Sequence, residues 1–211
     1  LNKYSDIVLS VNGEIYNYEE LYRCVLHNKY TPKTKSDCEV IINLYEEFGS
    51  DCIKMLDGVF SFVLYDKKNS ILLVARDPIG INPLYYGITD ENALMIASEM
   101  KSLDEDCVTI NSFPPGHYLE YKMDGKNNIE LTIIEEAITQ YYFPKWDSPE
   151  FINYKENEID KLYSDIRDSL TQSVEKRLMC DVPFGVLLSG GLDSSLIASI
   201  TNRLLKEKTT S

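Results

Sequence analysis

The stretch Val182-Pro-Phe-Gly-Val-Leu-Leu-Ser-Gly-Gly-Leu-Asp-Ser-Ser-Leu196 decides how the C-terminal part of the chain folds. Its run Val186-Leu-Leu188 is apolar and long enough for a short buried strand. Ser189-Gly-Gly191 follow as a turn without bulky side chains, and Leu196–Ile200 has the pattern of a helix. A strand, a glycine turn and a helix N-terminus gather unpaired backbone N–H groups around one point. The geometry therefore suits a phosphate.

The type of phosphate loop follows from the residues around the glycines. No Lys-Ser or Lys-Thr pair follows the last glycine, so the loop is not of the Walker A type. Gly190-Gly191 alone would favour an ordinary tight turn. The complete Ser189-Gly-Gly-Leu-Asp-Ser-Ser195 is more specific, and it resembles the pyrophosphate-binding loop of the N-type ATP pyrophosphatases. That resemblance implies that ATP is split into AMP and pyrophosphate to adenylate a substrate.

Composition limits the possible classes of protein. The 211 residues, 44% of them hydrophobic, suffice for one or two domains with a sizeable core. A net charge of −13 argues against a nucleic-acid partner, which would call for clustered Lys and Arg. No apolar run has transmembrane length and no signal peptide is visible, so no membrane association is expected. Five widely spaced cysteines and two histidines favour reduced thiols in a cytoplasmic compartment, without a metal site.

The pattern of the chain changes from strands to helices after residue 140. We expect one domain over residues 1–140, a linker rich in proline and polar residues over 141–157, and the start of a second domain over 158–211. Apolar residues three or four positions apart predict an amphipathic helix over Glu158–Leu178, with its apolar face in the core. Because the chain opens with Leu1 and ends soon after a helix begins, we expect it to be part of a longer protein.

Two motifs with polar residues lie in the first 50 residues of the first domain. Asp6–Tyr16 alternates like a strand, and Asn12-Gly13 alone favours a type I′ hairpin turn, with a return strand starting at Ile15-Tyr16. Ser36-Asp-Cys-Glu39 reads as a capping box at the start of a helix that ends at Gly49. The capping box would place Asp37 in the first turn of that helix.

Further strands are predicted along the first domain. Val59–Tyr65 and Ser70–Ala75 are apolar on both faces, which indicates central strands. Leu84–Tyr86 and Leu94–Ala97 are expected to continue that sheet. Further strands are expected at His117–Tyr121 and, after a turn at Asp124-Gly125, at Ile129–Ile133.

The motifs that carry a family resemblance occur in one order: Asn12-Gly-Glu-Ile-Tyr-Asn17, Ser36-Asp-Cys-Glu39, Arg76-Asp-Pro-Ile-Gly80, Ser98-Glu-Met-Lys101 and Ser189-Gly-Gly-Leu-Asp-Ser-Ser195. Together they resemble the glutamine-hydrolysing asparagine synthetases over essentially the whole chain. The resemblance implies a class II glutaminase domain with the αββα sandwich of the N-terminal-nucleophile hydrolases. It also implies that the second part is the beginning of an α/β ATP pyrophosphatase domain with a parallel sheet.

The resemblance also implies roles for individual residues. Asn12 and Gly13 match the oxyanion hole and bind glutamine, while Glu14 and Asp37 match the carboxylates that hold the α-amino group of glutamine. The residues that match the ATP site are Leu187, Ser189, Gly190, Gly191, Asp193, Ser194 and Ser195. The implied small-molecule substrates are glutamine, aspartate and ATP with Mg²⁺. Whether the protein forms a homodimer is left open.

Two features depart from the family pattern. The family nucleophile is a cysteine at the mature N-terminus, and no Cys-Gly opening precedes Asn12. Cys38 lies inside the predicted capping box and reads as a core cysteine rather than a substitute nucleophile. The 211 residues alone are therefore expected to hydrolyse no glutamine. The alternatives are a related synthetase with another acceptor, such as a β-lactam synthetase, and a non-catalytic ligand-binding relative.

Overall fold

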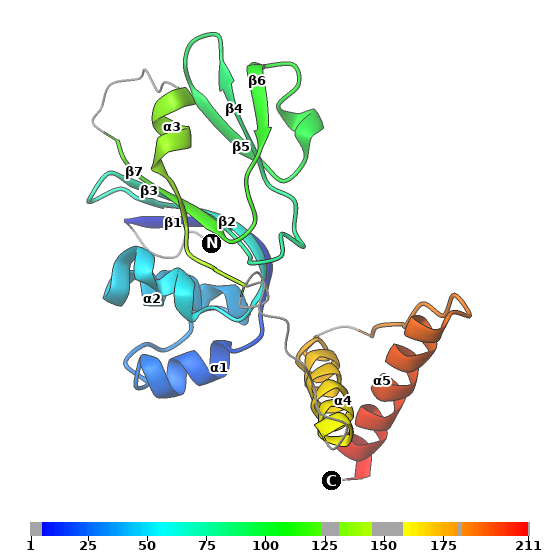
Figure 1. The fold of residues 1–211 in the computed structure, drawn as a ribbon. Helices are drawn as coiled ribbons and strands as arrows, with labels where there is room; N and C mark the ends of the chain where they lie inside the picture. The colour runs from blue at the N-terminus through cyan, green and yellow to red at the C-terminus, as the bar shows by residue number, and fades with distance from the viewer. Residues whose placement is uncertain (1–5, 124–130, 145–157, 181–182, 211) are drawn as a thin grey trace. The chain divides into compact units, whose positions relative to one another are not determined.

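The computed structural model describes residues 6–123, 131–144, 158–180 and 183–210 (Figure 1). The chain divides into two compact units, residues 1–147 and 148–211. The division falls within the predicted linker 141–157, most of which lies outside the described residues. The domain limits given above stay a prediction, and each unit is described by itself below.

Two antiparallel sheets form the N-terminal unit. The larger has the order β1 (Ile7–Ile15), β2 (Gly58–Asp66), β3 (Ile71–Arg76), β7 (His117–Lys122) and β8 (Ile138–Gln140). The smaller has the order β5 (Leu94–Ala97), β4 (Tyr85–Thr89) and β6 (Cys107–Ser112). The predicted central strands are β2 and β3 of the larger sheet, so that prediction is confirmed.

Helices of this unit pack on the larger sheet and beside the smaller one. α1 (Tyr18–Glu20) continues into the helical turn Leu21–Val25, and α2 (Val40–Phe48) lies between the short turns Asp37–Glu39 and Gly49–Met55. Figure 1 shows α1 and α2 on the side of the larger sheet that faces away from the smaller sheet. α3 (Leu131–Ala137) is followed directly by β8 in the chain.

Strand alternation divides the apolar side chains of this unit between two cores. One core lies between the larger sheet and the helices, where Phe60 and Phe62 of β2 join Ile41 of α2. The other lies between the two sheets, where Val74 of β3 meets Tyr86 of β4. It also contains Ile134 of α3. The layered sandwich class predicted for this domain is confirmed by this arrangement.

Several strand predictions were wrong in detail. β4 and β5 form a second sheet instead of continuing the first, and β6 was not predicted because its residues do not alternate cleanly. Residues 131–133, predicted as the end of a strand, begin the helix α3. The β-branched residues Thr132 and Ile133 favour a strand, but packing of Leu131 and Ile134 into the inter-sheet core overrides that propensity. The turn at 124–125 lies outside the described residues.

The predicted capping box does not form. The Ser36 side chain makes no cap hydrogen bond. The Glu39 carboxylate is buried and instead accepts hydrogen bonds from the backbone N–H groups of Lys33, at 2.7 Å, and Thr34, at 2.6 Å. In a capping box the Glu39 carboxylate would accept a hydrogen bond from the backbone N–H of Ser36. Here it accepts from the two loop residues instead. The prediction that α2 ends at Gly49 is confirmed, because Gly49 has a positive φ of 58° that favours glycine.

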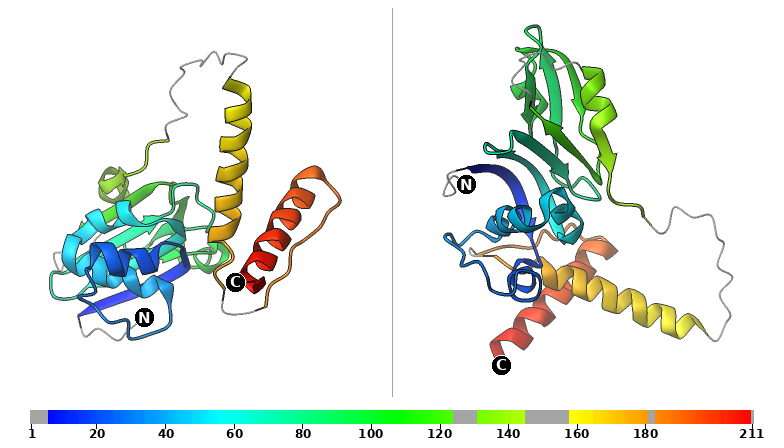
Figure 2. Two further views of the ribbon diagram at one scale, coloured as in Figure 1. Left: turned by 90° about the horizontal axis from the view of Figure 1, so that it is seen from below. Right: turned by 90° about the vertical axis from the view of Figure 1, so that its left-hand side faces the viewer.

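In its described residues, 158–180 and 183–210, the C-terminal unit has the two α-helices α4 (Ile159–Lys176) and α5 (Leu192–Thr210). They pack against each other along the C-terminal half of α4, with Val174 buried against Ile200 and Leu204 (Figure 2). The predicted helix 158–178 is confirmed. Its apolar face is not core throughout, because Tyr163 is 67% exposed in the described unit.

The predicted strand Val186–Leu188 is absent from the described part of this unit. Leu187 is 93% exposed and Leu188 is 65% exposed. A strand needs a neighbour to accept its backbone hydrogen bonds, and no described segment of residues 158–210 is a strand. The apolar run therefore pairs with no described segment of this unit.

Candidate functional site

Asn12 and Gly13 lie within β1 and not in a turn. The strand pairs with β2 through Asn12 opposite Ser61 and Gly13 opposite Phe60, and it continues to Ile15. The hairpin interpretation of the Asn-Gly pair is therefore wrong, because the ladder runs through the dipeptide. The structure places Asn12 and Glu14 with exposed side chains near the end of this strand.

Gly13 is required by the close approach of the two strands. A Cβ atom on Gly13 would lie 2.2 Å from the carbonyl oxygen of Val59 and 2.6 Å from the Cα of Phe60. Both atoms belong to the backbone of β2, so neither can move aside cheaply. The strand passes β2 at this point only because the residue has no side chain.

Gly13→Ala is expected to destabilise the N-terminal unit by about 1–3 kcal/mol, because the added methyl group must push β1 and β2 apart. Thermal unfolding followed by circular dichroism measures the effect. Gly185→Ala is the matched control, since nothing lies within 4 Å of a Cβ there. Equal melting temperatures for the two variants would contradict the close approach.

Asp37 is brought to the end of β1 by a backbone hydrogen bond. Its Oδ2 accepts from the N–H of Ile15 at 2.6 Å, although the two residues are 22 positions apart. The carboxylate of Glu14 lies near enough to act electrostatically on Cys38, the neighbour of Asp37. The predicted residues Asn12, Gly13, Glu14 and Asp37 thus gather at one end of the strand. Two carboxylates there suit a single ammonium group.

Cys38 is buried behind this cluster, as the core interpretation predicted. Its side chain is 3% exposed, and its thiol donates to the carbonyl oxygen of Gly13 at 3.4 Å. Burial, together with the negative charge of Asp37, raises the pKa of the thiol to about 12. Cys38 is therefore a poor nucleophile.

Alkylation of the native protein is expected to separate the cysteines by exposure. At pH 8, iodoacetamide should modify Cys24 and Cys180, which are exposed, and spare Cys38 and Cys52, which are buried. Peptide mass spectrometry measures the modified fraction at each position, and a sample denatured in urea should label all five. Rapid labelling of Cys38 in the native sample would contradict its placement.

The segment Arg76–Asn82 supports the end of β1 where the predicted glutamine-site residues gather. The sequence motif alone had given this segment no role. Asp77 is 1% exposed, and its Oδ1 accepts from the N–H groups of Ile79, Gly80 and Ile81 at 2.7–3.2 Å. Its Oδ2 accepts from the N–H of Phe60 at 3.2 Å. An Asp before a Pro at a strand end is the available sequence signal, because Asp side chains commonly bond to nearby backbone in turns.

The loop before α5 has the expected turn and helix but no strand. Gly190 has a positive φ of 85°, and α5 begins at Leu192. The hydroxyls of Ser194 and Ser195 donate to the carbonyl oxygen of Gly191 at 3.1 and 2.8 Å. Ser189 Oγ lies 3.0 Å from Ser194 Oγ. The three serines thus lie around one turn, with exposed hydroxyls.

The remaining ATP-site predictions fall beside this turn. Asp193 lies in the first turn of α5. Leu187 and Ser194 line a cavity of about 720 Å³ between α4, α5 and the segment before the loop. The structure therefore brings the predicted residues of this site together around the helix N-terminus, which favours anions.

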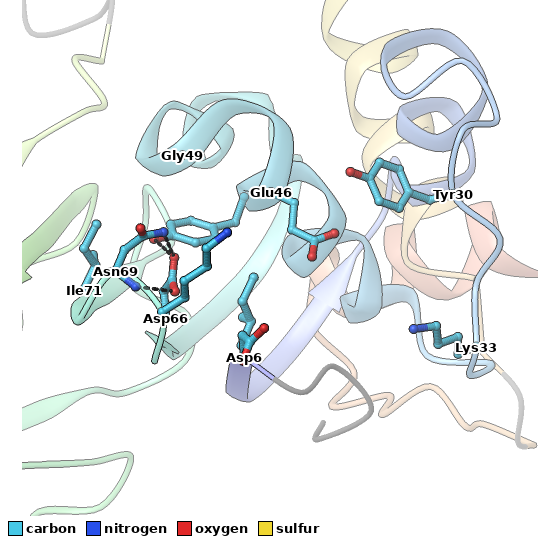
Figure 3. A pocket seen from close by; sticks show the side chains of 11 residues that line it. Asp6, Tyr30, Lys33, Glu46, Gly49, Asp66, Asn69 and Ile71 are labelled. Atoms are coloured by element: carbon cyan, nitrogen blue, oxygen red, sulfur yellow. Dashed lines mark hydrogen bonds between the residues drawn. The ribbon is translucent and has the colours of Figure 1, made fainter.

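A larger cavity, of about 820 Å³, lies at the other end of β1 (Figure 3). It is lined by Asp6, Lys33, Glu46 and Asp66, among others, and by none of the predicted glutamine-site residues. The Asp66 carboxylate is already held by Asn69 and Tyr45. The cavity is therefore separate from the candidate glutamine site.

No group of three or more His, Cys, Asp or Glu side chains within the described ranges is placed to hold a metal ion. Among the same residues, no helix combines the length and apolar character needed to cross a membrane.

Comparison with known proteins gave matches along almost the entire chain. The family model described as glutamine amidotransferase domain matches residues 1–121, and the one described as asparagine synthase matches residues 165–211. A probable asparagine synthetase (glutamine-hydrolyzing) of Dictyostelium discoideum is 44% identical over 99% of this chain and 35% of its own length. Asparagine synthetase (glutamine-hydrolyzing) 1 of Arabidopsis thaliana is 47% identical over 97% of this chain and 32% of its own length.

A solved structure was also matched. Glutamine phosphoribosylpyrophosphate amidotransferase from B. subtilis, complexed with ADP and GMP, is 25% identical with a TM-score of 0.49. The match covers 65% of this chain and 29% of that protein.

The family match covers more than half of the residues, and the chain belongs to the glutamine amidotransferase domain family. Within that family the resemblance to the glutamine-hydrolysing asparagine synthetases, predicted from the ordered motifs, is confirmed. The chain spans about a third of the length of these curated relatives.

Proposed function

We propose that this chain is part of an ATP-dependent ligase that makes asparagine from aspartate, with ammonia released from glutamine. The observation that carries the proposal is the presence of both halves in one chain. A glutamine amidotransferase match over residues 1–121 precedes an asparagine synthase match over residues 165–211. The names of relatives that are 44–47% identical support asparagine as the product, in preference to a β-lactam.

In the glutaminase half, this chain would bind glutamine and stabilise the oxyanion. The side-chain amide of Asn12 and the backbone N–H of Gly13 would donate to the tetrahedral oxyanion formed when the glutamine amide is attacked. Glu14 and Asp37 would hold the substrate ammonium. Because Cys38 is buried with a raised pKa, we propose that the nucleophile is a cysteine outside residues 1–211.

In the synthetase half, the serine-glycine loop would hold the pyrophosphate part of ATP. The hydroxyls of Ser189, Ser194 and Ser195 and the first N–H groups of α5 are the available donors. ATP would enter with Mg²⁺. Adenylation would turn the aspartate side-chain carboxylate, a poor electrophile, into an acyl-adenylate, from which ammonia displaces AMP. Cytoplasmic location and dimerisation stay predictions, to be tested by fractionation and sedimentation.

The test uses the full-length protein that carries this chain. Supplied with ATP, Mg²⁺, aspartate and glutamine, or with ammonium in place of glutamine, it should form asparagine and AMP in a one-to-one ratio. Residues 1–211 alone should release no ammonia from glutamine above a blank without protein. Asparagine with ammonium only would mean that the loop works but the glutaminase site does not. No AMP in either reaction would contradict the proposal, because the acceptor would then not be aspartate or the chain would only bind ligands.

A further inference from the structure

We propose that Asn82 is a positioning residue that fixes the direction of the Gly13 N–H in the oxyanion hole. The inference rests on the proposed glutaminase function. Nδ2 of Asn82 donates to the carbonyl oxygen of Asn12 at 2.8 Å, across 70 positions of sequence. This hydrogen bond joins the loop after β3 to the functional end of β1.

The contact acts on Gly13 through the geometry of the peptide bond. The carbonyl oxygen of Asn12 and the N–H of Gly13 belong to one peptide unit, which is planar and trans. In such a unit the C=O and the N–H point in opposite directions. A donor that fixes the oxygen of Asn12 therefore also fixes where the Gly13 hydrogen points. The same hydrogen bond polarises the peptide unit and strengthens its N–H as a donor.

Asn82 can act as an anchor because its own backbone is held on both sides. Its carbonyl oxygen accepts from Nε of Arg76 at 2.8 Å, and its N–H lies 3.4 Å from Oδ2 of Asp77. Arg76 is 9% exposed and Asp77 is 1% exposed, so both anchors are fixed in the protein interior. Arg76 also donates to the carbonyl oxygens of Phe113 and Gly80, at 2.6 and 3.0 Å.

The next peptide unit of β1 is held as well. The carbonyl oxygen of Gly13 accepts from the buried thiol of Cys38 at 3.4 Å. The N–H of Ile15 donates to Asp37 at 2.6 Å. Among these side-chain contacts, the one from Asn82 acts on the peptide unit that carries the Gly13 N–H, which the pairing of Asn12 with Ser61 in the β1–β2 ladder also holds. Its loss should therefore affect stabilisation of the oxyanion more than binding of the substrate amino group.

The test compares Asn82→Ala and the isosteric Asn82→Asp in the full-length protein. Asn82→Ala should lower kcat for glutamine hydrolysis about threefold to tenfold, the usual effect of one neutral hydrogen bond, with KM changed less than about twofold. Asn82→Asp should lower kcat at least as much, because it presents an acceptor to the Asn12 carbonyl. Ammonium-dependent synthesis should be unchanged in both variants.

A second readout separates positioning from a general structural effect. Glutamate γ-semialdehyde forms a tetrahedral adduct with the nucleophile, and its inhibition constant should rise by the same factor as kcat falls. Asn111→Ala is the matched control, since its half-buried amide lies on β6 of the smaller sheet, where it contacts Glu135, at 3.5 Å, and Tyr86. That variant should behave as wild type.

Each outcome decides the proposal. If Asn82→Ala unfolds, Asn82→Asp gives the answer, because it keeps the shape of the side chain. Wild-type kcat in either folded variant, or a change in KM alone, would overturn the positioning role. A wild-type protein that hydrolyses no glutamine would instead overturn the proposed function, so the two failures are distinguishable.

Discussion

Asn12→Ala is expected to lower kcat for glutamine hydrolysis about 10²- to 10³-fold, the effect of removing one oxyanion-hole donor. Asn12 lies at the functional end of β1, where its side chain is exposed and its backbone is held by Asn82. The lost amide would have donated to charge that develops only in the transition state, so KM should change little. Steady-state kinetics of glutamate formation in the full-length protein measure the effect.

The control for Asn12→Ala is the second reaction of the same protein. Asparagine synthesis from ammonium does not use the oxyanion hole and should stay within about twofold of wild type. Asn111→Ala, at a half-buried Asn on β6 of the smaller sheet, should leave both reactions unchanged. A glutaminase kcat within threefold of wild type in Asn12→Ala would show that this amide is not an oxyanion donor.

Asp77→Ala is expected to destabilise the N-terminal unit by about 3–5 kcal/mol. The carboxylate is buried and accepts five backbone N–H groups, those of Phe60 and of residues 79–82. Its removal leaves several donors without a partner and releases the loop that carries Asn82. Urea unfolding followed by circular dichroism measures the loss of free energy of unfolding.

The matched control for Asp77→Ala is Asp51→Ala. Asp51 is 71% exposed at its side chain and forms a surface ion pair with Lys54, which contributes about 0–1 kcal/mol. Asp77→Asn should fall between the two, because the amide keeps one accepting oxygen. A loss below 1 kcal/mol for Asp77→Ala would contradict the supporting role of the loop.

Local sequence pattern predicts the elements whose neighbours lie close in the chain. β2 and β3 were predicted because both are apolar on both faces and are joined by a short turn. α4 was predicted from its apolar spacing, and the end of α2 from Gly49, whose backbone has a positive φ. In each case the signal and the structure it specifies belong to the same short segment.

Features that depend on distant partners could not be predicted in this way. The Asn12-Gly13 pair reads as a hairpin turn, but pairing with β2 about 50 positions later keeps it within a strand. The hydrogen bond from Asn82 to Asn12 spans 70 positions and leaves no periodic trace. The apolar run Val186–Leu188 has a strand pattern but forms no strand, because no described segment of its unit pairs with it.

The site residues show the same division. The serine-glycine loop was recognised from contiguous residues, and the structure gathers its hydroxyls around one turn. The grouping of Glu14 with Asp37 came only from the family resemblance, because the capping box that seemed to position Asp37 does not form. A backbone hydrogen bond from Ile15 positions Asp37 instead.

The central claim is that the protein carrying this chain activates the aspartate side chain by adenylation. The most direct test supplies the full-length protein with ATP, Mg²⁺, glutamine and aspartate labelled with ¹⁸O in its side-chain carboxylate. Because ammonia displaces AMP from an acyl-adenylate, one labelled oxygen should leave with each AMP, and mass spectrometry of the AMP measures it. AMP without ¹⁸O, or ADP and phosphate in place of AMP and pyrophosphate, would contradict the account.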